Sequence, residues 1–195
     1  MKRALAYVAI AAAFACGSSD PYPHPPTGFN PVVAVTSPSP QSFQDFAVDS
    51  TAGQPSLELM ITRSMLYAAG MKHGVNPNLV MGLAWHESGW QASVVSSAGA
   101  VGIMQVMPAT AAVDGPALLN RTVNLYDPGD NIEMGTAILK NNLDHWGNDL
   151  AKALCAYYAG GAAVSDWNHM RSDCKRYVWA VYNAAMMFKQ GKGPV

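Results

Sequence analysis

The spacing of apolar residues after Pro55 places the strongest limit on what this chain can fold into. There they recur every three or four positions, whereas the strict alternation that indicates a strand is scarce. A repeat of this period lines apolar side chains along one face of a helix, and we therefore predict an all-α fold. The expected helices run from Ser56 to about His73, from Asn76 to about Ser88, from near Asp130 to Trp146, from Asp149 to Gly160 and from near Asp173 to Gly191.

The beginning of the chain has the pattern of an export signal. Two basic residues follow Met1, and the eleven residues from Ala4 to Phe14 are then apolar. A membrane-spanning helix needs about 20 apolar residues, so this run is too short to be an anchor. We assign residues 1–15 as a signal peptide.

Cys16 resembles the lipidated residue at the signal junction of bacterial lipoproteins, although residues 13–15 also satisfy the small-x-small rule for ordinary cleavage. Lipidation of Cys16 would leave Cys155 and Cys174 to pair in an oxidising compartment. We expect a lipid anchor facing the periplasm, and Gly17 after the cysteine indicates the outer membrane if the cell has one. The alternative is a released protein in which Cys16 is a free thiol.

Residues 16–55 are expected to form a disordered Pro-rich tether. The part after Cys16 holds eight of the chain's thirteen prolines, is rich in Ser, Gly and Thr, and has no periodic apolar pattern. A polyproline-like chain of this length, at about 3.1 Å per residue, could reach on the order of 100 Å. The alternative is a disordered leader without a spacing role. The folded domain is then expected over residues 56–190, with a tail over 191–195.

Charge argues against nucleic acid as a partner. Without the signal peptide, ten basic and thirteen acidic residues remain, a net charge of −3. No basic stripe indicates binding to nucleic acid or to an acidic membrane surface. A repeat of fixed period is also absent, which argues against a solenoid.

The segment WHESGW, residues 85–90, contains the best candidates for a catalytic or metal-binding residue. A zinc site on a helix would need a second histidine four residues after His86, and that position is Trp90. The other histidines are scattered singly, so we expect no metal site.

Glu87 shares one face of the second expected helix with Val80, Leu83 and Ala84. A helix that is apolar nearly all round is expected to be central and buried. Burial can raise the pKa of a carboxyl from about 4.3 to about 6, which suits a general acid. The alternative is a buried glutamate that only hydrogen-bonds a loop amide. The next stretch, residues 96–108, is dense in small residues that allow close backbone approach, and its final proline can start another helix at Ala109.

Three segments in order carry a resemblance to a known family: HGVNPNLVMGLAWHESGW, GAVGIMQVMP and DPGDNIEMGTAILKNNLDHWGNDLAKALCAYYAGGAAV. They resemble the catalytic Glu-Ser pair, the Gly-Leu-Met-Gln motif and the Ala-Tyr-Asn-Ala-Gly motif of the soluble lytic transglycosylase domain. Three motifs in this order are a specific signal. The resemblance covers residues 56–188 and implies the lysozyme-like helical fold shared with goose-type lysozyme, with a central catalytic helix.

The resemblance implies a role for each matching residue in the first two motifs. Glu87 would be the catalytic acid/base, and Ser88, which follows it as in the family, would contact the substrate. Ser96 would supply a hydroxyl that orients the Glu87 carboxyl. Gln105 and Met107 would contact the bound sugar.

In the third motif, Tyr157 would be a phenol at the cleavage site. Tyr158 stands where the family usually has Asn, which puts one polar contact in the groove in doubt, although a phenol can stack on a sugar. A disulfide between Cys155 and Cys174 would tie the motif helix to the last helix.

The implied reaction is cleavage of the β-1,4 bond between N-acetylmuramic acid and N-acetylglucosamine in peptidoglycan, with a 1,6-anhydro ring formed and no metal or organic cofactor. The partners would be the glycan strands and, through Cys16, a membrane; we expect a monomer. Besides Glu87 the chain has only Glu58 and Glu133, neither in a recognisable motif, whereas ordinary glycosidases use a carboxylate pair. The alternatives are a goose-type muramidase that hydrolyses the bond and a non-catalytic peptidoglycan-binding lipoprotein.

Overall fold

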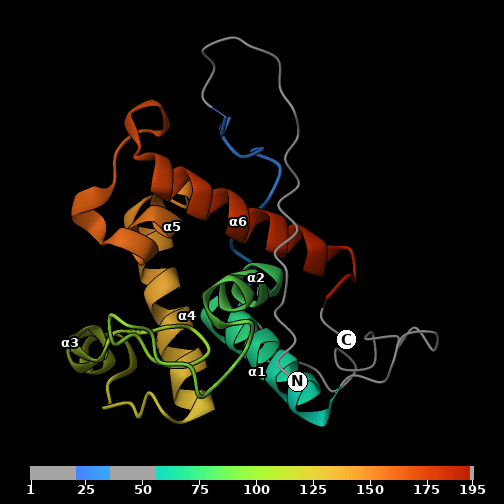
Figure 1. The fold of residues 1–195 in the computed structure, drawn as a ribbon, viewed down its shortest axis with the longest axis vertical. Coiled ribbons are helices and arrows are strands. Elements are labelled where there is room, and N and C mark those ends of the chain that lie inside the picture. Colours follow the sequence, from blue (N-terminus) through green and yellow to red (C-terminus); the bar gives the residue numbers. More distant parts are fainter. Residues whose placement is uncertain (1–20, 36–55, 194–195) are drawn as a thin grey trace.

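The computed structural model describes residues 21–35 and 56–193, and in these ranges it contains helices and isolated bridges but no extended strand (Figure 1). The helices are α1 (Leu57–His73), α2 (Pro77–Ser88), α3 (Pro108–Leu119), α4 (Pro128–His145), α5 (Leu150–Ala159), the short 3-10 helices η2 (Gly161–Ala163) and η3 (Trp167–His169), and α6 (Ser172–Lys189). The predicted all-α fold is confirmed for the described residues.

Local signals set the ends of the first two helices, as the sequence indicates. The Ser56 hydroxyl accepts a hydrogen bond from the Leu59 N–H at the start of α1, and Gly74 ends this helix with a φ of 68°. Asn76 caps α2, and Gly89 ends it with a φ of 62°. These boundaries place residue 87 in the last turn of α2.

Helices α3 and α4 differ from the expected positions. Helix α4 begins two residues before Asp130, because the Asp127 carboxylate accepts from the Asp130 N–H and caps the helix there. Helix α3 continues past Gly115 and Pro116 to Leu119, a length that the sequence analysis did not assign. Pro116 lies close to the C-terminal end of α3, so few helical turns follow the interruption that it causes.

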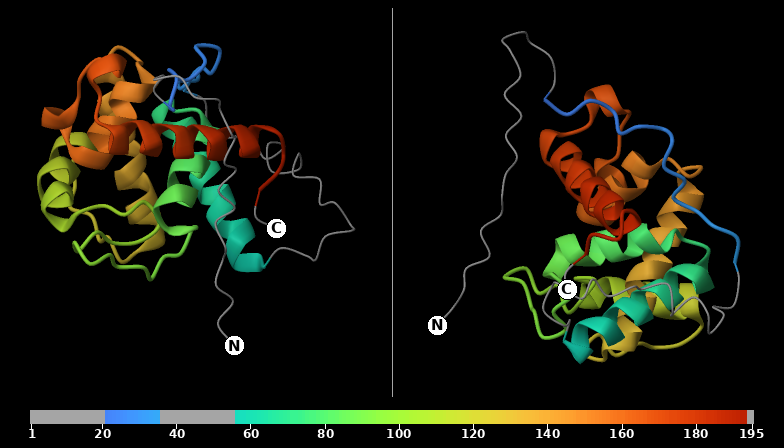
Figure 2. Two further views of the ribbon diagram at one scale, coloured as in Figure 1. Left: turned by 45° about the horizontal axis from the view of Figure 1, so that its top comes forward. Right: turned by 90° about the vertical axis from the view of Figure 1, so that its right-hand side faces the viewer.

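Helix α2 occupies the centre of the molecule and packs most extensively against α6 and then against α1 (Figures 1 and 2). Gly82 lets α2 and α6 cross closely, since a Cβ atom there would lie 2.5 Å from the backbone nitrogen of Ala185. The apolar side chains around this crossing are almost fully buried: Leu79, Val80, Met81, Leu83 and Ala84. The crossing brings the C-terminal end of α2 beside α6.

Helix α5 packs between α4 and α6 and is joined to α6 by a disulfide. Cys155 and Cys174 are bonded, with their Cα atoms 5.1 Å apart, and both residues are fully buried. These are the two cysteines that the sequence analysis pairs.

Residues 21–35 differ from the expectation of a tether, because they lie along the helical body (Figure 2, blue). We call residues 21–33 the strap. The indole N–H groups of Trp167 and Trp179 donate to the carbonyl oxygens of Tyr22 and Pro23, at 3.0 and 2.7 Å. Phe29 is buried and meets the ring of Tyr182 edge to face.

The other end of the strap is fixed by backbone hydrogen bonds. The Val33 N–H donates to the Gly74 carbonyl at 3.0 Å, and the Asn76 N–H donates to the Pro31 carbonyl at 2.8 Å. An extended Pro-rich chain has no internal hydrogen bonds, so its carbonyl groups are available as acceptors. Composition alone therefore predicts a linker for residues 21–33. In the structure, their carbonyl groups and the buried Phe29 hold this segment against the helices.

The assigned signal peptide, Cys16 and residues 36–55 lie outside the described residues, as do residues 194–195. None of the described helices combines the length and the apolar character that a membrane span requires.

Candidate active site

Glu87 lies in the last turn of α2 with its carboxyl largely buried. Burial raises the pKa of this carboxyl from its usual value near 4.5 to about 7, because the charged form loses solvation. The predicted raised pKa is therefore confirmed. A carboxyl of this pKa is both protonated and ionised in appreciable amounts near neutral pH.

Tyr177 is the hydrogen-bond partner of this carboxyl. Its phenol projects from α6 and donates to Oε1 of Glu87. This bond favours the carboxylate and so lowers the pKa of Glu87, against the larger effect of burial. Burial raises the pKa of the Tyr177 phenol well above its usual value, and the nearby Glu87 charge adds to the shift. Tyr177 therefore remains a hydrogen-bond donor at physiological pH.

Two rings hold Tyr177 in position. The Tyr158 ring is stacked on it with centroids 4.7 Å apart, and the His86 ring meets it edge to face at 5.0 Å. Burial lowers the pKa of His86, which favours its neutral form at neutral pH. His86 thus packs against the Tyr177 ring. This contact gives His86 a role other than the zinc ligand considered for the segment WHESGW.

The phenol of Tyr157 on α5 is directed into the loop between α2 and α3, residues 89–107. It donates to the Met104 carbonyl at 2.8 Å. Burial raises the pKa of Tyr157 well above its usual value, and the Glu87 charge raises it further, so the two groups are electrostatically coupled. Gly135 on α4 makes room here, since a Cβ atom would lie 2.4 Å from Met104 Cβ and 2.9 Å from the Tyr157 hydroxyl.

Asn131 attaches the same loop to α4. Its buried amide accepts from the Met104 N–H and donates to the Val101 carbonyl, each at 2.8 Å. Gly102, with a φ of 76°, presses against this amide, because a Cβ atom would lie 2.5 Å from Nδ2 of Asn131. The small residues of the loop therefore allow the close backbone approach that the sequence indicates.

Ser88 and Gln105, both expected near the sugar, donate hydrogen bonds to carbonyl oxygens of the α2–α3 loop. The buried Ser88 hydroxyl donates to the Ile103 carbonyl at 2.8 Å. Gln105 has a φ of 47°, and its side-chain amide donates to the Gly102 carbonyl at 2.9 Å. These bonds fix the shape of the loop beside the end of α2.

The hydroxyl of Ser96 is used within its own turn, where it accepts from the Ala100 N–H at 3.0 Å. A hydrogen bond to the Glu87 carboxyl, the role expected of Ser96, is donated by Tyr177. A serine followed by Gly99 and other small residues favours such a local turn over a reach to another helix.

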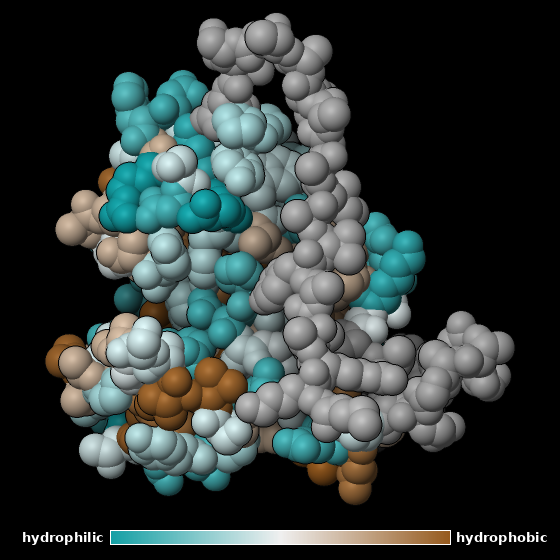
Figure 3. Space-filling view, in the orientation of Figure 1, coloured by the Kyte–Doolittle hydropathy of each residue, from teal (hydrophilic) through white to brown (hydrophobic). Residues whose placement is uncertain are grey.

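Met107 and Tyr158 are the most exposed of the expected site residues, with exposed fractions of 39% and 47%. Met107 precedes α3, and Figure 3 shows apolar side chains gathered on the surface over the α2–α3 loop. Exposed apolar and aromatic side chains near a buried acid can pack against the faces of a bound sugar.

Across residues 21–35 and 56–193, no group of three or more His, Cys, Asp and Glu side chains is arranged to hold a metal ion. A largely buried carboxyl with a pKa near neutrality and a phenol donor beside it can take part in proton transfer.

The sequence was compared with models of known protein families. The sequence model of the transglycosylase SLT domain matches residues 64–180. The chain belongs to the transglycosylase SLT domain family. The matched range includes Glu87, the α2–α3 loop, Tyr157 and Tyr158 of α5, and Tyr177 of α6.

Named relatives agree with this assignment. The chain is 37% identical over 128 residues to the transglycosylase of Enterobacteria phage PRD1, a match that covers 66% of this chain and 44% of the relative. It is 34% identical over 112 residues to membrane-bound lytic murein transglycosylase C of Haemophilus influenzae, covering 51% of this chain and 31% of that protein. The chain thus spans less than half the length of these relatives.

Among solved structures, the 70 kDa soluble lytic transglycosylase of Escherichia coli is similar, with 26% identity and a TM-score of 0.58 over 67% of this chain and 25% of that one. The same enzyme has been solved in complex with bulgecin A. The lysozyme-like SLT fold that the sequence predicted is therefore confirmed.

Sequence reasoning missed three residues of this SLT site: Tyr177, Asn131 and Gly135. Tyr177 could have been found from its position, three residues after Cys174 and directly before Val178 on the apolar stripe of the last helix. Asn131 and Gly135 contact the α2–α3 loop, which lies about thirty residues earlier in the chain. No local sequence pattern indicates such contacts.

Proposed function

We propose that this chain is a peptidoglycan lytic transglycosylase in which Glu87 alone serves as acid and base. It would cleave the β-1,4 bond between N-acetylmuramic acid and N-acetylglucosamine and leave 1,6-anhydro-N-acetylmuramic acid ends. The observation that carries the proposal is the buried Glu87 carboxyl, with a pKa of about 7 and a hydrogen bond from Tyr177, in an SLT fold.

In the first step, protonated Glu87 donates its proton to the bridging oxygen as the bond from that oxygen to the muramic acid C1 breaks. The substrate's acetamido group stabilises the electron-poor C1. Glu87 is left as a carboxylate, and the Tyr177 hydrogen bond stabilises its charge.

In the second step, the Glu87 carboxylate takes the proton from the muramic acid 6-hydroxyl while the oxygen of that hydroxyl bonds to C1. The 1,6-anhydro ring closes and Glu87 returns to its protonated form, so protons balance over the cycle. A pKa of about 7 suits both steps, because neither protonation state is strongly favoured at neutral pH.

The ionised state of Glu133 supports a mechanism in which only one carboxyl acts. Glu133 forms ion pairs with Lys72 and Arg121, and these partners lower its pKa, although partial burial opposes the shift. A carboxylate held in this way is a poor second acid or base.

We assign the remaining site residues to two roles. Met107 and Tyr158 contact the glycan through their exposed surfaces. The other four fix the shape of the α2–α3 loop beside the end of α2 through their hydrogen bonds: Ser88, Ser96, Gln105 and Tyr157.

The protein is also proposed to be exported and anchored by lipid on Cys16. Support comes from the basic and apolar start of the chain, and from the disulfide between Cys155 and Cys174, which leaves Cys16 as the third cysteine. If Cys16→Ala stays in the membrane fraction as the wild type does, the anchor lies elsewhere.

Mass spectrometry of the products released from purified peptidoglycan tests the reaction. Anhydro-muropeptides support transglycosylation. Reducing ends would instead identify a goose-type muramidase, and binding without cleavage would identify a non-catalytic wall-binding protein.

A further inference from the structure

The strap, residues 21–33, crosses the outside of the domain and is fixed at both ends. At its beginning, the carbonyl oxygens of Tyr22 and Pro23 accept from two tryptophans, one in η3 and one in α6. The His24 ring also meets the ring of Trp167, with centroids 5.2 Å apart. The first described residues are therefore bound beside η3 and α6.

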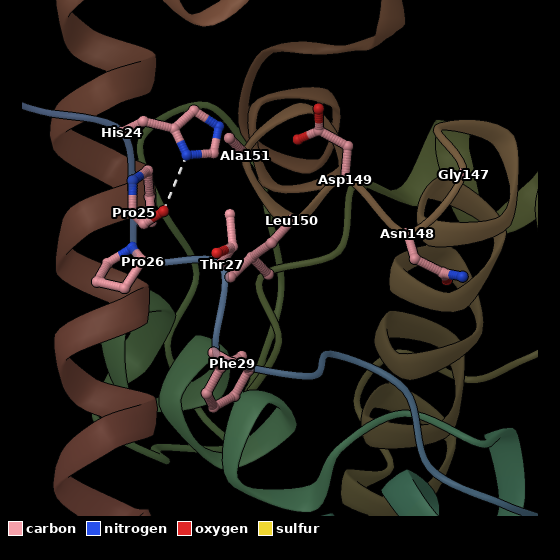
Figure 4. A pocket seen from close by; sticks show the side chains of 10 residues that line it. All are labelled: His24, Pro25, Pro26, Thr27, Phe29, Gly147, Asn148, Asp149, Leu150 and Ala151. Carbon is pink, nitrogen blue, oxygen red and sulfur yellow. Dashed lines mark hydrogen bonds between the residues drawn. The ribbon is translucent and has the colours of Figure 1, made fainter.

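The middle of the strap is less closely packed. Figure 4 shows its residues His24 to Phe29 facing residues 147–151, which end the turn after α4 and begin α5. The pocket between them has a volume of about 280 Å³. Pro25 and Phe29 are buried in this part of the strap. The two indole hydrogen bonds hold the strap's beginning.

The sequence places Cys16 only five residues before Pro21. Since a chain spans at most about 3.6 Å per residue, Cys16 lies within roughly 18 Å of Pro21. A free tether from Cys16 to Ser56 would instead have a root-mean-square length on the order of 35 Å and a much longer maximum reach. Docking of the strap thus shortens the connection between a lipid on Cys16 and the folded domain.

We propose that the strap fixes the SLT domain close to the membrane, with the surface around η3 and Trp179 of α6 facing the lipid. The inference rests on the lipid anchor proposed for Cys16 and extends it by specifying distance and orientation. The enzyme would then act on glycan strands near the membrane rather than at the end of a long tether.

Energy transfer to the membrane tests the proposal with the full lipidated protein in phospholipid vesicles. A fluorescent donor is attached through Asn168→Cys in η3 or, as a second position, through Val113→Cys on α3, which lies at another end of the molecule in Figures 1 and 2. Both side chains are exposed. A short-range acceptor on a lipid headgroup should receive at least about twofold more energy from position 168 than from position 113, as expected if η3 faces the lipid.

Two variants change the connection in different ways. Insertion of about twenty Gly and Ser residues after Asp20 lengthens it without altering the described domain. Trp167→Phe with Trp179→Phe removes both indole donors, and Trp146→Phe is the control because its indole donates to neither strap carbonyl. Transfer from position 168 should fall about twofold or more in the first two proteins and stay unchanged in the control.

Equal transfer from both labelled positions, or unchanged transfer after the insertion, would overturn the proposal even if the tryptophan variant failed to fold. Mass spectrometry that finds Cys16 without lipid would overturn both the anchor and this inference. Neither result affects the proposed reaction, because anhydro-muropeptide release from isolated peptidoglycan is measured separately.

Discussion

The Tyr177 phenol donates a hydrogen bond to the Glu87 carboxyl from a residue 90 positions further along the chain. The bond forms because α2 and α6 cross closely at Gly82, which brings the end of one helix beside the middle of the other. Burial raises the pKa of Glu87 and this bond lowers it, so the balance of the two sets the value near 7.

Tyr177→Phe should shift the pH dependence of kcat/KM toward higher pH. The variant loses the hydrogen bond that favours the carboxylate, so the pKa of Glu87 rises and its acid form persists further into the alkaline range. Turnover should also fall roughly 10- to 100-fold, since a hydrogen bond to a charged group contributes about 1.5–3 kcal/mol. The measurement is a pH series on purified peptidoglycan. Tyr182→Phe, on the same helix but facing Phe29, serves as control, and an identical shift in both variants would refute the assignment.

Glu87 should also make folding stability depend on pH. Its pKa is raised from 4.5 to about 7 on folding, so the unfolded state releases this proton first and stability falls as pH rises between those values. The loss should reach about 3 kcal/mol above pH 7, at 1.36 kcal/mol per pKa unit. Urea unfolding from pH 4 to pH 8 should show this loss in the wild type but not in Glu87→Gln. Parallel curves for the two proteins would contradict the raised pKa.

The bond between Cys155 and Cys174 should contribute about 3 kcal/mol to folding stability, as the chain-entropy model gives for a loop of this size. Cys155→Ala with Cys174→Ala should lower the free energy of unfolding by about this amount. Activity should become more heat-sensitive, because the bridge joins the helices that carry Tyr157 and Tyr177. Non-reducing peptide mapping of the exported protein provides the direct check, and two free thiols would refute the pairing.

Gly135→Ala should disturb the α2–α3 loop where that loop packs against α4. The added methyl group would overlap Met104 and crowd the Tyr157 hydroxyl, which must shift the loop between α2 and α3. We expect a loss of about 1–3 kcal/mol in stability, together with reduced turnover. Gly161→Ala is the matched control, because nothing lies within 4 Å of a Cβ atom there. Similar unfolding free energies and activities for the two variants would show that the contact does not matter.

The helices and the position of Glu87 could be predicted because their signals are local. Caps such as Ser56 and Asn76 define helix ends from a few neighbouring residues, and the apolar spacing around Leu83 identifies the buried face. Such features depend on the period of a helix and not on which other elements pack against it.

The partners of Glu87 could not be derived in this way. The contact with Tyr177 depends on how closely α2 and α6 cross, and the role of Asn131 depends on a loop about thirty residues earlier in the chain. The docked strap shows a related limit, since proline-rich composition indicates a linker and gives no sign that Trp167 and Trp179 bind its carbonyl groups.

The most direct test of the account is the rate at which Glu87→Gln releases anhydro-muropeptides from purified peptidoglycan. The amide matches the carboxyl in size but cannot donate and recover a proton, so turnover should fall by about 10²–10⁴-fold. Glu133→Gln, a change of the same kind in a surface ion pair, and added chelator should leave most activity in place. Anhydro-muropeptide release by Glu87→Gln at near the wild-type rate would contradict the assignment of Glu87 as the acid and base.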